Sequence, residues 1–268
     1  MTQDQPGQAP RFDPTVASIA RIYDYWLGGK DNFKADREAG DAMIRQYPDI
    51  VQGVRMNRAF LGRAVHYLAA EAGIRQFLDI GTGLPSSNNT HEVAQRAAPQ
   101  SRIVYVDNDP IVLNHAQALL NSTPEGACAY IDADLRDTAK ILKDAANVLD
   151  FSQPVALCLI MVLQFIPDDD DPWQIVRTLM DAVPSGSYLA VAHPASDVDR
   201  EVGPALRQLN TRMGGTRAVA RSHQQVSAFF DGLEMVEPGL VQLHRWRPGT
   251  GVENGRDLAA YGGVGRKP

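Results

Sequence analysis

The sequence predicts a doubly wound α/β fold, in which a mostly parallel sheet of seven strands is covered by helices on both faces. From Arg75 onward, short and almost wholly apolar runs alternate with stretches of helical periodicity, as is typical of parallel strands buried on both faces. Before Arg75 the apolar spacing is helical only, which predicts a helical segment in front of the sheet. The chain has 268 residues, of which 44% are hydrophobic and 22% charged, so it can bury one sizeable core.

Three helices are expected in front of the sheet. Apolar residues recur every three or four positions over residues 16–27, and Gly28 and Gly29 then end this first helix. A second helix is expected over residues 33–47, and a third begins at Pro48 and continues to residue 73.

The parallel part of the sheet is expected to hold five strands, at residues 76–80, 102–107, 127–132, 155–163 and 187–192. Helices are expected between them near residues 88–98, 110–121, 138–149 and 171–183, and after them near 201–213 and 222–230. Two closing strands, around residues 233–236 and 240–246, would form an antiparallel hairpin at the sheet edge.

These elements divide the chain into four parts. They are a disordered tail (1–13), a helical lid (14–73), a sheet domain (74–247) and an extended C-terminal arm (248–268), the arm being predicted from its many glycines.

Composition also bears on location and partners. No apolar run approaches the roughly 18 to 20 residues that span a bilayer, and the first dozen residues lack the apolar stretch of a secretory signal. We therefore expect a cytoplasmic protein without a membrane partner. The formal charge of −6 argues against nucleic acid as the main partner. Cys128 and Cys158 lack metal-site spacing and are expected to be reduced.

Ligands of such sheets bind beyond the carboxyl ends of the strands, where three signals occur in order. Gly81 and Gly83 follow the first strand and allow a tight turn close to a ligand. Asp107 ends the second strand, where a carboxylate accepts hydrogen bonds from a ribose diol. After the third strand, Asp134 is placed to receive an adenine amino group while Leu135 packs on the ring. Together they predict a nucleoside site, although each has an alternative explanation as an ordinary turn or helix cap.

The absence of a third glycine and of basic residues in the first loop narrows the choice of nucleoside ligand. A dinucleotide-binding turn reads GxGxxG, but here Pro85, Ser86 and Ser87 follow Gly83 and Leu84, so the third glycine is missing. Residues 81–89 also contain no Arg or Lys to neutralise phosphates. A pyrophosphate therefore fits poorly. S-adenosylmethionine has adenine, ribose and an amino acid without phosphate, and it fits.

The chain resembles the class I S-adenosylmethionine-dependent methyltransferases, whose first motif is an acidic residue followed by GxGxG. More narrowly, it resembles a bacterial family called S-adenosyl methyltransferase, formerly a domain of unknown function, in six stretches: ARIYDYWLGGKDNFKADRE, RMNRAF, FLDIGTGLPSSNNTHEVAQ, VYVDNDPIVL, DADLRD and YGGVGRKP. The resemblance covers the chain from Ala17 to Pro268 and departs from the broad motif at Pro85.

The resemblance implies a Rossmann-like domain that binds S-adenosylmethionine, forms S-adenosylhomocysteine and needs no metal. It places the methionine part against the first loop, the ribose on Asp107, the adenine between Asp134 and Leu135, and the methyl donor before the residues after the fourth strand. The full expected cofactor set is Gly81, Thr82, Gly83, Asp107, Asn108, Asp134, Leu135, Met161, Leu163 and Gln164.

Methyl transfer from a sulfonium requires alignment and exclusion of water, so a lid is expected. The break in the helical front is the candidate, with a plain connector as the alternative. The expected lid or substrate residues are Tyr25, Gly28, Gly29, Asn32, Phe33 and Arg58. The aromatic residues Tyr23, Tyr25, Trp26 and Phe33 are placed either near the sulfonium or in the core, and Arg58 either binds a carboxylate or is simply exposed.

Two further features concern catalysis. His193 follows the fifth strand and is the candidate for removing an acceptor proton, with a structural role as the alternative. The acidic run over residues 168–171 is better explained by helix capping than by metal binding.

The resulting hypothesis is a methyltransferase acting on a small-molecule acceptor by in-line displacement. Two alternatives stay open: a protein that binds S-adenosylmethionine or S-adenosylhomocysteine without turnover, and an NAD-dependent oxidoreductase. The sequence predicts neither the acceptor atom nor the oligomeric state.

Overall fold

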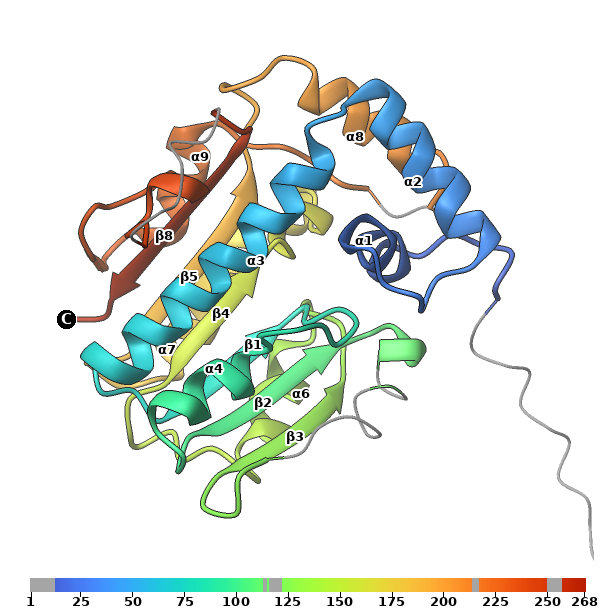
Figure 1. Cartoon of the computed structure of the whole chain (residues 1–268). Coiled ribbons are helices and arrows are strands. Elements are labelled where there is room, and N and C mark those ends of the chain that lie inside the picture. Colours follow the sequence, from blue (N-terminus) through green and yellow to red (C-terminus); the bar gives the residue numbers. More distant parts are fainter. Residues whose placement is uncertain (1–12, 113–114, 116–121, 214–216, 250–256) are drawn as a thin grey trace, which may run out of the picture.

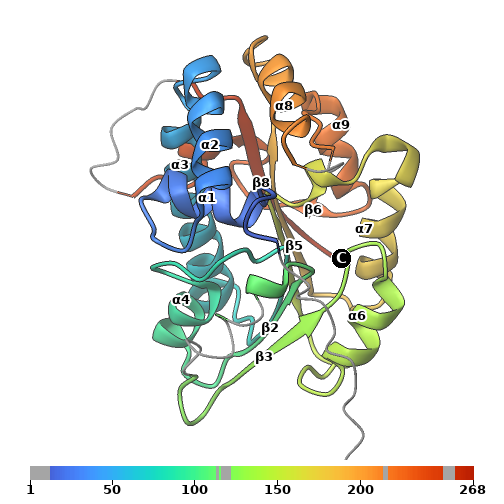
Figure 2. The same cartoon turned by 90° about the vertical axis from the view of Figure 1, so that its right-hand side faces the viewer.

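The computed structural model describes residues 13–112, 115, 122–213, 217–249 and 257–268. Within these residues, an eight-stranded sheet lies between two layers of helices, and further helices lie above the carboxyl ends of the strands (Figures 1 and 2). The strands are β1 (Gln76–Ile80), β2 (Arg102–Asp107), β3 (Ala127–Asp132), β4 (Ala156–Ile160), β5 (Tyr188–Pro194), β6 (Glu234–Met235), β7 (Val241–Gln242) and β8 (Ala260–Arg266).

The described helices match most of the expected ones, with shorter bounds. They are α1 (Ile19–Leu27), α2 (Lys34–Gln46), α3 (Ile50–His66), α4 (Thr90–Ala97), α6 (Thr138–Ala145), α7 (Pro172–Asp181), α8 (Val202–Asn210) and α9 (His223–Ser227). Short turns of 3₁₀ or π type are η1 (Tyr67–Glu71), η2 (Leu163–Phe165), η3 (Asp168–Asp170), η4 (Ala228–Phe230) and η5 (Leu243–Arg245). Most of the helix expected at 110–121, the tail at 1–12 and residues 250–256 of the expected arm lie outside the described residues.

The strand order is β3-β2-β1-β4-β5-β8-β6, and β7 also pairs with β8. The five strands from β3 to β5 are parallel, as expected, so their carboxyl ends share one edge of the sheet. The order reverses direction at β1, where the crevice between β1 and β4 opens.

Both faces of the sheet are buried, which explains the apolar runs. In β1, Leu78 and Ile80 belong to one hydrophobic cluster, which also contains Ile141 of α6 and Leu179 of α7. Phe77 points to the opposite face and belongs to a second cluster, which includes side chains of α3 and α4. Neighbouring residues of a strand therefore point to opposite layers, and both faces of the strand are mostly apolar.

Capping residues mark the ends of the helices at positions that the sequence indicates. α1 ends at Gly28, whose φ of 83° is in the left-handed region that glycine favours. The carboxylate of Asp171 caps α7 by accepting a hydrogen bond from the main-chain N–H of Gln174, so this part of the acidic run is a helix cap.

The helical front is held together by a buried ion pair. Arg21 of α1 donates through Nε to Asp36 of α2 at 2.8 Å, and both side chains are almost fully buried. The same carboxylate also accepts hydrogen bonds from the main-chain N–H groups of Ser18 and Phe33. These bonds fix the orientation of α1 relative to α2. Both helices lie above the carboxyl ends of the strands (Figure 1).

The expected hairpin of closing strands is wrong. β6 and β7 do not pair with each other; each pairs antiparallel with β8, and residues 243–245 form a 3₁₀ turn instead of continuing a strand. Two short segments that are close in sequence can be taken for a hairpin when their common partner lies elsewhere in the chain.

The expected extended arm is also wrong for its last part. Residues 260–266 form β8, which pairs antiparallel with β5 over seven residues and is almost fully buried. The glycines that suggested an arm make room for neighbours: a Cβ on Gly262 would lie 2.7 Å from Leu243 Cδ2 and 2.9 Å from the ring of Phe60. In a strand, such glycines mark close approach of other groups.

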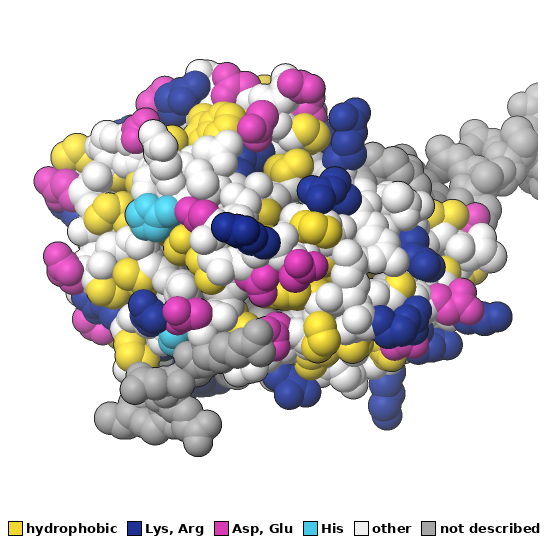
Figure 3. All heavy atoms as spheres, turned by 90° about the horizontal axis from the view of Figure 1, so that it is seen from above, with side chains coloured by type: hydrophobic (Ala, Val, Ile, Leu, Met, Phe, Trp, Pro, Cys, Tyr) yellow, Lys and Arg dark blue, Asp and Glu magenta, His cyan; other side chains and the backbone are white. Residues whose placement is uncertain are grey.

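No helix among the described residues is long and apolar enough to cross a membrane. The face seen from above the strand ends carries interspersed acidic and basic side chains (Figure 3). The cytoplasmic location stays a prediction.

The packing around β8 leads to a stability prediction. Gly262→Ala should lower the free energy of unfolding by about 1 to 3 kcal/mol, because the new Cβ would overlap Phe60 and Leu243, which are buried and must shift to admit it. Gly53→Ala is the control: nothing lies within 4 Å of a Cβ at this position of α3, and alanine favours a helix. Urea unfolding of both variants checks this, and equal stabilities would contradict the role given to Gly262.

Candidate functional site

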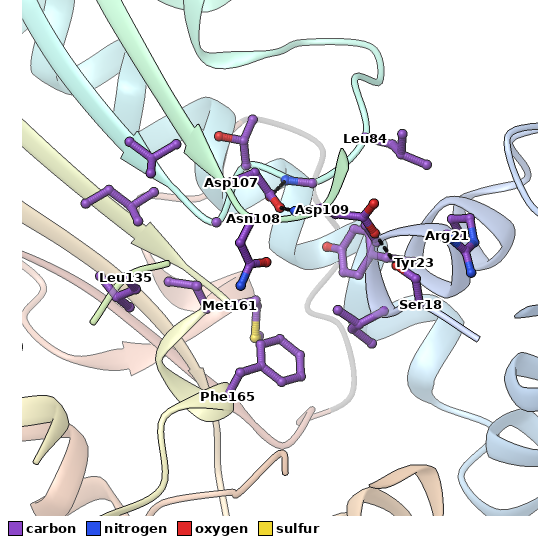
Figure 4. Close-up of a pocket in the computed structure, with 18 of the residues that line it drawn as sticks. Ser18, Arg21, Tyr23, Leu84, Asp107, Asn108, Asp109, Leu135, Met161 and Phe165 are labelled. Atoms are coloured by element: carbon purple, nitrogen blue, oxygen red, sulfur yellow. Dashed lines mark hydrogen bonds between the residues drawn. The ribbon is translucent and has the colours of Figure 1, made fainter. Parts of the chain in front are cut away.

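A cavity of about 920 Å³ opens above the carboxyl ends of the parallel strands. Figure 4 shows Ser18, which precedes α1, and Arg21 and Tyr23 of α1 on one side of it. On the other side are Leu135, Met161 and Phe165, which follow β3 and β4. The cavity therefore lies between the sheet and the helical front.

The loop after β1 forms the floor of the cavity. Gly81 and Gly83 have φ values of 75° and 67°, in the left-handed region that side chains disfavour. A Cβ on Gly81 would lie 2.3 Å from Val162 Cγ2, so only glycine lets this loop approach the residues after β4. Gly81, Thr82 and Gly83 all line the cavity, as the sequence predicts.

Asp107 joins the loops that follow β1 and β2. One oxygen of its carboxylate accepts a hydrogen bond from the Gly83 N–H at 2.8 Å, and the other accepts one from the Asp109 N–H at 2.9 Å. Burial is the largest influence on this group and raises its pKa above the ordinary value, while the two main-chain donors act in the opposite direction. Each oxygen keeps a further lone pair for a ligand.

The residues after β3 form one end of the cavity. Asp134 accepts a hydrogen bond from Asn108 Nδ2 at 3.1 Å and pairs with Arg136, which also pairs with Asp170. Leu135 is buried and lines the same end. The structure thus brings Asn108, Asp134 and Leu135 together as expected, and the carboxylate is held in place by a guanidinium.

Only part of the segment after β4 faces the cavity. Met161 lines it, but Leu163 is fully buried in the core, and Gln164 turns inward to donate to the carbonyl oxygen of Met161 at 2.8 Å. The 3₁₀ turn η2 causes this, because it rotates successive side chains away from the cavity and brings Phe165 to its wall. The expectation that Leu163 and Gln164 contact the cofactor is therefore not supported.

The helical front contributes to the cavity through α1 and α3. Of the expected lid residues, only Arg58 lines it, and its guanidinium donates to the carbonyl oxygens of Ser87 and Asn88, both at 3.1 Å. The other five, Tyr25, Gly28, Gly29, Asn32 and Phe33, are not among the lining residues.

The bonds of these five residues explain their position. The hydroxyl of Tyr25 donates to Asp41 at 2.6 Å, and Asn32 donates to Asp24 at 2.9 Å. The turn after α1 is thus tied back onto the helical front instead of reaching over the cavity. Of the four aromatic candidates, Tyr23 lines the cavity and Trp26 is buried in the core.

His193 lies away from the cavity, which overturns its expected role. The ring is fully buried; Nε2 accepts a hydrogen bond from Arg221 Nη1 at 2.8 Å, and Nδ1 lies 2.9 Å from the Pro194 carbonyl oxygen. Burial, and then the charge of Arg221, lower its pKa to about 3. A neutral, enclosed imidazole with both nitrogens engaged has no path to a substrate proton.

The partner of His193 has a structural task. The guanidinium of Arg221 is almost fully buried and donates to the carbonyl oxygens of Leu163 and Ile166 and to the carboxylate of Asp168. It thereby fixes the loop after β4, which carries Phe165 to the cavity wall. The acidic run is therefore divided between this ion pair, the one with Arg136 and the α7 cap. Among the described residues, no group of three potential ligands is arranged for a metal.

Several lining residues were not anticipated, including Ser18, Arg21, Asn57, Asp79, Asp109 and Phe165. Two of them carried a signal in the sequence. Asp79 is the acidic residue two positions before Gly81 in the first motif, and Asn57 stands beside Arg58 in the stretch RMNRAF.

Comparison with known proteins agrees with this geometry. The family model described as S-adenosyl methyltransferase matches residues 5–268. The crystal structure of a DUF574 family protein from Streptomyces avermitilis is 51% identical, covers 96% of this chain and 99% of that chain, and superposes with a TM-score of 0.92. A presumed methyltransferase from Thermobifida fusca is 39% identical over 96% of this chain and 97% of that chain, with a TM-score of 0.88.

A more distant structure shares the fold only. The plantazolicin methyltransferase BpumL, solved with a substrate analogue and S-adenosylhomocysteine, is 9% identical, covers 93% of this chain and 96% of that chain, and has a TM-score of 0.52. No curated protein is similar to the chain.

Asp79 generates a pH prediction. Its carboxylate is buried under the first loop and accepts a hydrogen bond from Thr90 Oγ1 at 2.5 Å. Burial raises its pKa from 3.8 to about 6, so the folded protein holds a proton that the unfolded chain releases. The free energy of unfolding should therefore fall by about 3 kcal/mol as the pH rises from about 4 to about 6.

Asp79→Asn should remove most of this decline, because the amide oxygen still accepts from Thr90 and does not ionise. Unfolding by urea at several pH values measures it. Asp181→Asn, at an exposed position, should keep the wild-type profile, and a decline that persists in Asp79→Asn would contradict the assignment.

Proposed function

This chain belongs to the S-adenosyl methyltransferase family and is an S-adenosylmethionine-dependent methyltransferase, and we propose that it transfers the methyl group to a small-molecule acceptor by in-line displacement. The observation that carries the proposal is that one continuous cavity reaches from the strand-end carboxylates to the helical front. Its volume of about 920 Å³ is at the upper end for small-ligand pockets, so cofactor and acceptor can share it.

The proposed cofactor contacts follow the order of the strands. Asp134 and Leu135 after β3 hold the adenine, Asp107 after β2 holds the ribose hydroxyls, and the loop from Gly81 to Gly83 after β1 holds the methionine part. The remaining lone pairs of the Asp107 carboxylate match the two donors of a ribose diol. Bound there, the cofactor supplies a methyl group on a positively charged sulfur.

The protein's contribution to the reaction is alignment and exclusion of water. Two kinds of contact hold α1 over the cavity. Ser18 Oγ donates to Asp109 at 2.5 Å, and Ala20 packs with Leu84, Ile111 and Val112 in a small hydrophobic cluster of its own. We therefore assign the role of lid to α1 itself, instead of the double-glycine turn after it.

No proton acceptor is assigned to the reaction. His193 is enclosed, and the Tyr23 phenol has its pKa raised to about 12 by burial, so it stays protonated at neutral pH. The proposed catalysis depends on placing the acceptor in line with the sulfonium. Family membership does not support the alternatives of a nicotinamide enzyme or a cofactor-binding protein without turnover.

Replacement of the proposed ribose ligand tests the cofactor site. Asp107→Ala should weaken binding of S-adenosylhomocysteine by about 1 to 3 kcal/mol, since two ribose hydroxyls lose their acceptor in a buried place. Isothermal titration measures this. Asp132→Ala is a matched control, because Asp132 pairs in register with Asp107 on the neighbouring strand but does not line the cavity. Equal losses in both variants would contradict the assignment.

The acceptor class is tested with labelled S-adenosylmethionine and a cell extract separated by dialysis. We expect label in a dialysable compound that separates from the cofactor by chromatography, and much less of it when Asp107→Ala replaces the wild type. Label that appears only in protein or nucleic acid would contradict a small-molecule acceptor, although it would leave methyl transfer itself intact.

A further inference from the structure

The strand order indicates where the amino-acid end of the cofactor lies. If adenine, ribose and methionine lie above β3, β2 and β1 in turn, the ammonium and carboxylate groups extend past the first loop toward α3. Arg58 of α3 is bonded to Ser87 and Asn88, which follow that loop, so α3 borders this end of the cavity.

We propose that Asn57 of α3, held by Tyr23 of α1, binds the ammonium group of the cofactor's amino-acid end through its Oδ1 atom. This inference rests on the proposed function, because it concerns the same cofactor in the same cavity. It adds a recognition residue outside the strand-end loops, and the residue belongs to the helical front.

An unpaired buried atom is the first observation behind the proposal. Asn57 lines the cavity, yet only 4% of the residue is exposed. Its Nδ2 donates to the hydroxyl oxygen of Tyr23 at 2.8 Å, whereas its Oδ1 is buried without a hydrogen-bond partner in the described part of the chain. Buried polar atoms are nearly always paired, so an acceptor left unpaired beside a ligand cavity indicates a donor on the ligand.

Tyr23 determines which atom of the amide is left unpaired. The Tyr23 hydroxyl donates its proton to the carbonyl oxygen of Val54 at 3.2 Å, and it therefore faces Asn57 as an acceptor. The amide responds by turning Nδ2 toward Tyr23, which leaves Oδ1 on its other side. Because burial keeps the phenol protonated, this arrangement persists at neutral pH.

The surrounding charges suit an amino acid in its zwitterionic form. The carboxylates of Asp24 and Asp79 line the same cavity and favour a positive group, and the guanidinium of Arg58 favours a negative one. Burial raises the pKa of Asp79 and of Tyr23, and the charge of Arg58 opposes this rise in both groups. Asn57 is therefore placed among groups of both signs, as recognition of an ammonium and a carboxylate on one carbon requires.

The test compares two ligands and two substitutions by isothermal titration. S-adenosylhomocysteine carries the amino-acid end, and 5′-methylthioadenosine keeps the adenosine and the sulfur but lacks that end. Asn57→Leu should weaken S-adenosylhomocysteine by about 10- to 100-fold, the effect of losing a hydrogen bond to a charged group, and should leave 5′-methylthioadenosine unchanged. Asn57→Asp keeps an acceptor oxygen and should bind S-adenosylhomocysteine within a few-fold of the wild type.

Tyr23→Phe is the second variant, in case Asn57→Leu does not fold. It removes the group that orients Asn57, so S-adenosylhomocysteine should bind more weakly while 5′-methylthioadenosine does not change. Equal weakening of both ligands would show a merely structural role and overturn the proposal.

Two other results would also overturn it. Unchanged affinities would show that Asn57 makes no contact, and an Asn57→Asp variant weaker than Asn57→Leu would show that the residue faces the carboxylate of the ligand. A wild-type protein that binds neither compound would instead overturn the proposed function, on which the inference rests.

Discussion

The shape of the cavity depends on the hydrogen bonds that the Asp107 carboxylate accepts from two loops. A carboxylate that is partly withdrawn from water needs hydrogen-bond donors, and here the donors are main-chain N–H groups from the loop after β1 and the loop after β2. The second loop continues to Asp109, which accepts a hydrogen bond from Ser18 at the start of α1. One acidic residue thus connects the sheet, both ligand loops and the helical front.

The parallel half of the fold could be predicted from the sequence because strands buried on both faces appear there as apolar runs. Each of these strands is a mostly apolar run, and the helices carry local signals of their own, such as Gly28 at the end of α1 and Asp171 at the start of α7. β8 has no such apolar run, because its sequence is rich in glycine. Gly262 is required by Phe60 of α3 and Leu243 of η5, which are far away in the sequence, so only the folded chain shows why a glycine-rich segment is a strand.

The candidate site divides in the same way. Gly81, Gly83, Asp107 and Asp134 could be predicted because topology alone places the ends of parallel strands together. Residues whose direction depends on a single turn could not. The 3₁₀ turn η2 sends Leu163 and Gln164 into the core, and long-range pairing encloses His193 with Arg221.

The position of β8 also has a consequence for synthesis on the ribosome. β5 pairs with β4 on one side and with β8 on the other, and β8 is the last strand that the structure describes. Until residues 260–266 emerge, a strand that is fully buried in the finished protein presents a row of free main-chain groups in the middle of the future sheet. An unpaired strand edge favours association with other chains, so the incomplete protein is more prone to aggregate than the finished one.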